Sequence, residues 1–136
     1  MIVADANLVV HLVWPSDQTP AADAVWSRDP VWVAPPLYLA ELRSAVGVAV
    51  RQRTLAVDVA VAMIERAQSM MHDAARPVSS RTVLELSRDT GCSTYDCEYV
   101  ALATALGVRL VTSERGVLRA FPKVAISPAD FAASGP

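Results

Sequence analysis

Few residues of this 136-residue chain can form disulfides or bind metals through sulfur and imidazole, because it has only two cysteines and two histidines. Two cysteines are too few for the disulfide framework of a small secreted protein, so the composition favours a cytoplasmic protein. Cys92 and Cys97 are separated by four residues without a further cysteine–histidine pair nearby, which is a poor match to a zinc site. We therefore expect both cysteines to lie in the core or at helix ends.

Long apolar runs are also absent. No segment reaches membrane-spanning length without a charged residue. Asp5 interrupts the first apolar segment and no basic segment precedes it, so we expect no signal peptide. There is no internal repeat, low-complexity tract or linker, and the length predicts one domain over residues 1–136, with residues 132–136 as a flexible tail.

Positive charge is scarce as well, since 12 basic residues stand against 14 acidic ones and the net charge is −2. This balance argues against a protein held to nucleic acid by bulk charge alone. Eleven of the twelve basic residues are arginines, however, and arginine makes local phosphate contacts of defined geometry.

Apolar residues are abundant, at 53% of the chain against 19% charged, which predicts an ordered core. Short apolar segments predict strands at 1–4, 31–34, 77–79, 109–112 and 124–126. Helices are predicted between them at 7–13, 19–28, 37–52, 56–71, 80–90, 94–106 and 114–120. This alternation predicts an α/β fold with three layers, in which helices cover both faces of a short, mostly parallel central sheet.

Residues with special backbone roles mark several helix ends. Thr19, followed by Pro20, and Thr94 are predicted to be N-caps, because their side-chain oxygens can accept hydrogen bonds from the first helical turn. Gly91 and Gly107 are predicted to end helices, since glycine readily takes the left-handed conformation found there.

Four acidic residues occupy positions that can meet at one edge of such a sheet. Asp5 and Glu114 directly follow predicted strands, Asp96 lies in a first helical turn, and Glu41 lies on the helix after the second strand. Each also has a purely structural interpretation, as an N-cap, a partner of a helix dipole or a solvated side chain. In parallel sheets, ligands bind beyond the carboxyl ends of the strands. Carboxylates gathered there would repel one another, and a hard cation such as Mg²⁺ or Mn²⁺ would relieve the repulsion.

Four motifs in order make the chain resemble the PIN domain family, and more narrowly the VapC-type toxins. They are D-A-N at 5–7, A-E-L at 40–42, T-Y-D-C-E-Y-V-A-L-A at 94–103 and L-V-T-S-E at 110–114. The resemblance covers nearly the whole chain and implies a PIN-like fold. It implies that the catalytic, metal-binding acids are Asp5, Glu41 and Asp96, that Asn7 and Thr112 are supporting polar residues, and that Glu114 replaces the aspartate usual in the family.

The resemblance also implies a function. It predicts a Mg²⁺-dependent endoribonuclease, the toxin of a toxin–antitoxin system, which hydrolyses RNA phosphodiester bonds with a metal-activated water. Mn²⁺ would substitute for Mg²⁺. The implied partners are a cognate antitoxin, an RNA substrate and a second copy of the chain, without a membrane.

Two other functions stay open at this point. One is a non-catalytic PIN-like binding module with a degenerate metal site, for which Glu114 is the sole support. The other is a phosphohydrolase that uses Asp5 as a nucleophile. D-A-N at 5–7 lacks the second aspartate of the D-x-D pattern of haloacid dehalogenases, which argues against this second function.

Three further expectations concern individual side chains. Glu114 is one methylene longer than aspartate, so we expect it to act through a water or on a second metal ion rather than as a direct ligand. Tyr95 and Tyr99 are expected to pack against neighbours rather than to stack on bases. The mean hydropathy of +0.32 and the clustering of Trp14, Trp26 and Trp32 predict an apolar groove for an antitoxin segment or a second subunit.

Overall fold

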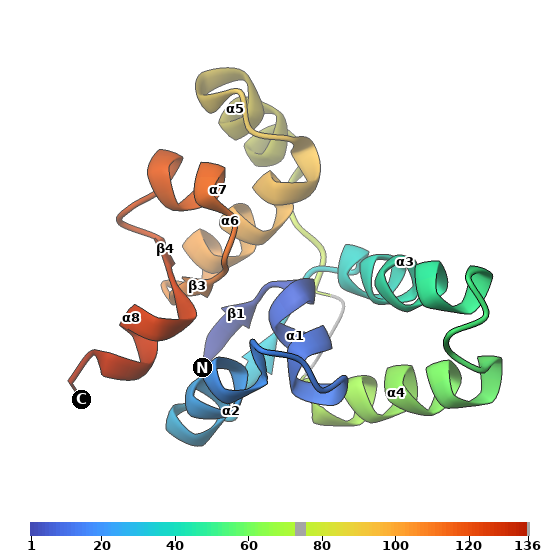
Figure 1. The fold of residues 1–136 in the computed structure, drawn as a ribbon. Coiled ribbons are helices and arrows are strands. Elements are labelled where there is room, and N and C mark those ends of the chain that lie inside the picture. Colours follow the sequence, from blue (N-terminus) through green and yellow to red (C-terminus); the bar gives the residue numbers. More distant parts are fainter. Residues whose placement is uncertain (73–75, 136) are drawn as a thin grey trace.

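The computed structural model describes residues 1–72 and 76–135, and within them the chain alternates between short strands and helices (Figure 1). The strands are β1 (Ile2–Ala4), β2 (Trp32–Val33), β3 (Leu110–Val111) and β4 (Ala125–Ile126). The helices are α1 (Ala6–Val13), α2 (Thr19–Arg28), α3 (Leu37–Arg51), α4 (Val57–Met70), α5 (Ser80–Thr90), α6 (Thr94–Leu106), α7 (Arg115–Ala120) and α8 (Pro128–Ala133).

The strands form one parallel sheet in the order β2-β1-β3-β4, which confirms the predicted α/β fold with a short parallel sheet. Val3 of β1 pairs with Val33 on one side and with Leu110 on the other. The next residue, Ala4, pairs with Val111, so β1 and β3 end side by side. Their carboxyl ends therefore deliver the following residues of both strands to the same edge of the sheet.

One predicted strand is wrong, because residues 77–79 adopt no regular structure. The chain approaches the edge of the sheet there, where the amide of His72 donates to the carbonyl of Trp32 and that of Arg76 donates to Ala34. Pro77 follows immediately and has no amide hydrogen to continue a ladder. The segment at 77–79 therefore follows a stretch of chain that contacts the edge of the sheet, but it does not form a strand of its own.

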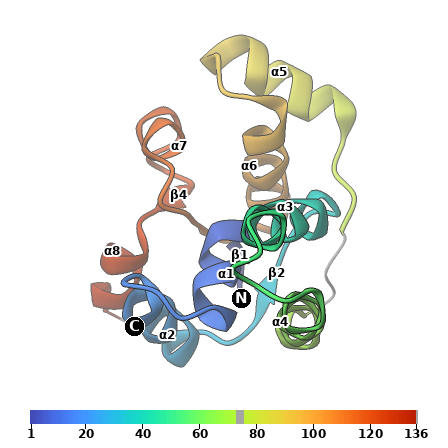
Figure 2. The same cartoon turned by 45° about the vertical axis from the view of Figure 1, so that its right-hand side comes forward.

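Helices cover both faces of the sheet. All three residues of β1 are buried, although successive side chains of a strand point to opposite faces. Helix α6 packs on β1 and β3, while α1 packs against α2, α3 and α4. Helices α3 and α4 run alongside each other (Figure 1), and a second view shows α5 at the outer end of α6, away from the sheet (Figure 2).

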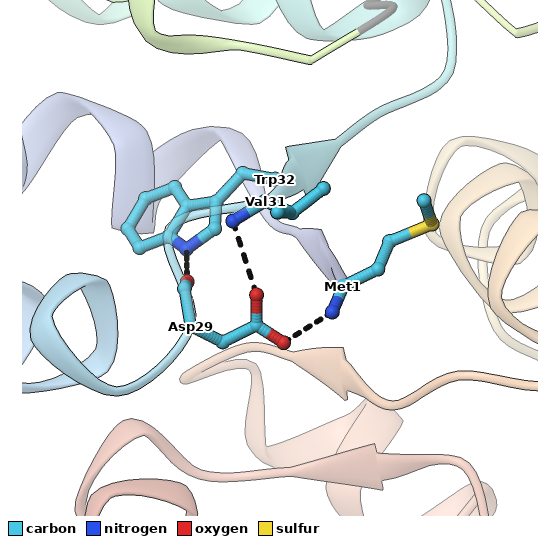
Figure 3. A network of polar contacts seen from close by, with 4 residues as sticks. All are labelled: Met1, Asp29, Val31 and Trp32. Atoms are coloured by element: carbon cyan, nitrogen blue, oxygen red, sulfur yellow. Dashed lines mark hydrogen bonds and ion pairs between the residues drawn. The ribbon is translucent and has the colours of Figure 1, made fainter.

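A polar network fixes the amino end of the sheet (Figure 3). The N-terminal amine of Met1 forms an ion pair with the carboxylate of Asp29, whose other oxygen accepts the amide of Val31 at 3.0 Å. The indole nitrogen of Trp32 donates to the backbone carbonyl of Asp29 at 2.7 Å. These contacts tie the start of β1 to the segment that leads into β2, and so help to hold the register of the two strands.

The predicted helices are confirmed to within two residues at each end, with small differences at the caps. Thr94 is the first residue of α6 and Ser93 is its N-cap, accepting the amide of Asp96 at 3.1 Å. Thr19 is the first residue of α2, where its hydroxyl accepts the amide of Ser16 and donates to the carbonyl of His11. Gly91 and Gly107 adopt the predicted left-handed conformation.

Helix α8 was not predicted, and it extends to Ala133, into the segment from residue 132 that the sequence analysis expected to be a flexible tail. Ser127 caps the helix by accepting the amide of Asp130, Pro128 occupies its first turn, and Phe131 is buried. The helix packs against α2, and the guanidinium of Arg28 donates to the carbonyl of Gly135. Residues 132 and 133 are therefore helical, and residue 136 lies outside the described residues.

Two of the three tryptophans pack against each other. Trp32 is fully buried, and Trp26 packs edge-on against it with ring centroids 5.2 Å apart. The large apolar side chains that are exposed lie elsewhere, at Met1, Val48, Val57, Val59, Val61, Leu84 and Tyr95. Tyr95 thus departs from the expectation that it packs, whereas Tyr99 is buried. Within the described part of the chain, no helix is long and apolar enough to cross a membrane.

Candidate metal centre

Asp5 stands where β1 ends, and two hydrogen bonds fix its carboxylate. The hydroxyl of Thr112, which follows β3, donates to Oδ2 of Asp5 at 2.6 Å. The amide of Asn7 donates to Oδ1 at 3.5 Å, so Asp5 is also the N-cap of α1. The pairing of Ala4 with Val111 explains the contact, because it places the next residue of each strand side by side.

Glu41 lies on helix α3, which follows β2, and it is near enough to Asp5 to feel its charge. Its carboxylate accepts a hydrogen bond from the phenol of Tyr99, on α6. Glu41 is half-buried and Tyr99 is buried. The contact therefore connects α3 with α6 through two residues that are 58 positions apart in sequence.

Asp96 comes from the first turn of α6, one helical turn before Tyr99. Residues three apart lie on the same face of a helix, so the two side chains point toward the same region. A small pocket at the edge of the sheet brings residues from α6 together with those that follow the strands. It is lined by Asp5, Asp96, Tyr99, Leu110, Thr112 and Val117.

The acids interact electrostatically even though they come from distant segments. Burial raises the pKa of Asp5 above its ordinary value of 3.8, and the charge of Asp96 raises it further, while the Thr112 hydrogen bond lowers it. Burial also raises the pKa of Glu41, as do the charges of Asp5 and Asp96, and the Tyr99 hydrogen bond opposes the shift. Among the described residues, none of these three acids forms an ion pair with a basic group. The site is thus a region of uncompensated negative charge.

Glu98 adds a fourth acid that the sequence analysis missed. It is half-buried on α6, and its charge contributes to the raised pKa of Glu41. Glu98 is two residues from Asp96, and on a helix that offset points side chains in different directions. The sequence alone therefore gave no reason to group it with the metal-binding candidates.

Asn7 and Glu114 contact the site through their backbones. Asn7 is exposed, and its amide rather than its side chain bonds Asp5. Glu114 is also exposed, and its amide donates to the hydroxyl of Thr112 at 3.0 Å. In the described residues no contact joins the Glu114 carboxylate to the other acids. Thr112 therefore accepts from Glu114 while it donates to Asp5, which orients its hydroxyl.

The donor set fits a hard divalent cation in its chemistry. Every candidate ligand is a carboxylate oxygen, and such ligands favour Mg²⁺ or Mn²⁺ over zinc. In the described residues, no three carboxylate, imidazole or thiol groups stand close enough to hold an ion by themselves. Mg²⁺ needs only one or two direct carboxylates, because it keeps several of its waters.

Comparison with known proteins adds information on the fold. No protein-family model and no curated protein matches the sequence. The structure is similar to the crystal structure of PAE2754 from Pyrobaculum aerophilum, with a TM-score of 0.73 and 22% identity over 98% of this chain and 96% of that chain. It is also similar to a chain in a toxin–antitoxin complex from Klebsiella pneumoniae, with a TM-score of 0.66 and 16% identity over 94% of this chain and 98% of that one. At these identities the likeness shows the fold alone.

Proposed function

We propose that this chain is a Mg²⁺-dependent endoribonuclease of the PIN/VapC type and the toxin of a toxin–antitoxin pair. The observation that carries the proposal is the arrangement of Asp5, Glu41 and Asp96. These half-buried acids come from three distant segments, the charge of Asp96 raises the pKa of both Asp5 and Glu41, and no basic group pairs with them among the described residues. Uncompensated charge of this kind costs folding free energy, and a bound divalent cation would remove the cost.

The structural comparisons support the proposal at the level of the fold. One of the similar structures belongs to a toxin–antitoxin complex, and the likeness spans almost the whole of both chains. The sequence resemblance to the PIN family points to Asp5, Glu41 and Asp96, and these are the acids whose charges interact in the structure. The resemblance rests on motifs, whereas the geometry rests on the pairing of β1 with β3, which brings Thr112 to Asp5, and on the contact of Tyr99 with Glu41.

In this proposal, Asp5, Glu41 and Asp96 hold the metal ion and Thr112 orients Asp5. The bound ion would supply charge neutralisation at the phosphate and an activated water for hydrolysis. Thr112 fixes one oxygen of Asp5, which leaves Oδ1 turned toward the weaker contact with the amide of Asn7. Glu114 stands at the rim, where its longer side chain acts through water or on a second ion.

The proposed partners are a cognate antitoxin, RNA and a second copy of the chain. The antitoxin is supported by the complex that contains the Klebsiella chain, and the homodimer by the family resemblance. Because the net charge is −2, RNA would be held by local arginine contacts and by the metal ion rather than by a broadly basic surface.

The test is Mg²⁺-dependent cleavage of RNA by the purified chain. Wild type should cleave with Mg²⁺ and stop with a chelator, and Asp96→Asn should lower the rate at least about 100-fold. Asp58→Asn is the matched control, because Asp58 also lies in the first turn of a helix, α4, but is exposed and away from the site. We expect this control to retain wild-type activity.

Expression of the chain alone gives a second readout. Wild type should arrest growth and Asp96→Asn should not. A folded Asp96→Asn protein that cleaves and arrests growth like wild type would contradict the proposal. A wild type that binds Mn²⁺ and RNA but does not cleave would replace it with the non-catalytic binding module.

A further inference from the structure

Like Thr112, Tyr99 is a buried, uncharged side chain that contacts the acids from inside the core. Only 4% of it is exposed, it lines the pocket with Asp5 and Asp96, and its phenol donates to Oε2 of Glu41. Tyr99 also lies one helical turn after Asp96. Tyr99 thus contacts or adjoins all three proposed metal-binding acids, and its hydroxyl points at Glu41.

Glu41 has a greater need of such a contact than Asp5. Asp5 is a short side chain beside a strand, and both of its oxygens accept hydrogen bonds. Glu41 has a longer, more flexible side chain on α3, and the charges of Asp5, Asp96 and Glu98 all repel it. Without a donor, the Glu41 carboxylate would gain rotamer freedom and reduce repulsion by turning away from the other acids.

The phenol of Tyr99 is suited to this task because it remains a donor. A carboxylate can only accept, so the hydroxyl of Tyr99 is the donor in its contact with Glu41. The phenol contacts Oε2 of Glu41 and, among the described residues, no hydrogen bond occupies Oε1. One oxygen would be held while the other is available to a ligand.

We propose that Tyr99 is a positioning residue that holds the Glu41 carboxylate toward the metal centre, as Thr112 holds that of Asp5. This inference rests on the proposed function, because it assumes that the acids bind a divalent cation. Groups that orient metal ligands commonly change metal affinity by 10–100-fold when they are removed. Tyr99 acts through Glu41 and is not itself assigned contact with metal or RNA.

The test is the affinity for Mn²⁺, measured by calorimetry or electron paramagnetic resonance without RNA. Tyr99→Phe should weaken Mn²⁺ binding about 10-fold or more, since it removes only the donor. Tyr95→Phe is the matched control, because it makes the same change on the same helix at a side chain that is 62% exposed. We expect Tyr95→Phe to bind Mn²⁺ like wild type.

A double-mutant cycle separates positioning from general damage. If Tyr99 acts through Glu41, Tyr99→Phe should weaken Mn²⁺ binding no further in a Glu41→Gln background. An equal loss in both backgrounds would overturn the inference. Should Tyr99→Phe fail to fold, Glu41→Asp keeps the charge but shortens the reach to the phenol. Unchanged Mn²⁺ affinity in Glu41→Asp would overturn the inference as well.

The outcomes also separate this inference from the proposed function. If wild type binds Mn²⁺, Asp5→Asn weakens it and Tyr99→Phe does not, the inference about Tyr99 alone is wrong. If wild type does not bind Mn²⁺, both proposals fall together.

Discussion

Two carboxylates, Asp29 and Asp5, lie at opposite ends of β1 and have opposite surroundings. At the amino end, Asp29 is paired with the N-terminal amine of Met1 and accepts the amide of Val31 (Figure 3). At the carboxyl end, Asp5 faces the charge of Asp96 and, among the described residues, no basic group. An acid that is paired with a positive charge stabilises the folded chain. Acids without such a partner lower its stability, and a bound cation would remove this loss.

The largest effect that we predict is that replacing aspartate by asparagine changes stability in opposite directions at Asp29 and at Asp5. Asp29→Asn should lower the free energy of unfolding by about 1 kcal/mol, because it removes an ion pair. Asp5→Asn should raise the unfolding temperature of the metal-free protein by roughly 2–5 °C, because the amide can still accept from Thr112 without carrying charge. Thermal unfolding in the presence of a chelator measures the stability of both variants. An Asp5→Asn protein less stable than wild type would contradict the prediction.

The stability gain of an uncharged variant should depend on pH. In wild type the pKa values of Asp5 and Glu41 are raised on folding, so the folded chain binds protons more readily than the unfolded chain. Their favourable contribution is present below the ordinary values of 3.8 and 4.5 and is lost as pH rises through the folded pKa values. Glu41→Gln should therefore gain stability over wild type as pH rises from about 4 to 7.

The measurement is the unfolding temperature of wild type and Glu41→Gln across this pH range without metal. Asp29→Asn serves as the control, and its difference from wild type should not change sign. A Glu41→Gln advantage that is larger at pH 4 than at pH 7 would show that the acids are not the source of the cost.

The smallest effects are expected at Glu114, whose carboxylate is exposed and contacts none of the other acids among the described residues. Glu114→Asp should leave Mg²⁺-dependent cleavage within about 3-fold of wild type. Glu114→Gln should cost less than Asp5→Asn or Asp96→Asn in the same assay. If Glu114→Gln is as damaging as Asp5→Asn, Glu114 is a direct ligand. If Glu114→Asp activates an inactive wild type, the binding-module alternative is favoured.

Local patterns in the sequence predicted most of the elements. Continuous apolar segments located β1 to β4, and glycines at 91 and 107 located two helix ends. The segment at 77–79 was misassigned because an apolar pattern does not show whether a strand finds hydrogen-bond partners, and Pro77 lacks one of the donors. Helix α8 was missed although Ser127, Pro128 and Asp130 form a helix-start pattern that could have revealed it.

The site was predictable where it depends on strand ends and unpredictable where it depends on side chains from different helices. Asp5 and Thr112 follow two strands that proved adjacent, so their meeting follows from the fold. The contact of Tyr99 with Glu41 depends on how α3 and α6 pack, which spacing along one helix does not specify. The sequence analysis expected both Tyr95 and Tyr99 to pack, which holds for Tyr99 alone, and the hydrogen-bond partner of Tyr99 became visible only in the structure.

The most direct test of the central claim is Mn²⁺ titration of wild type, Asp5→Asn and Asp29→Asn by calorimetry. The claim is that Asp5, Glu41 and Asp96 form one metal centre. Wild type and Asp29→Asn should bind with the same affinity, and Asp5→Asn should bind at least about 10-fold more weakly. Equal affinity in wild type and Asp5→Asn would contradict the claim.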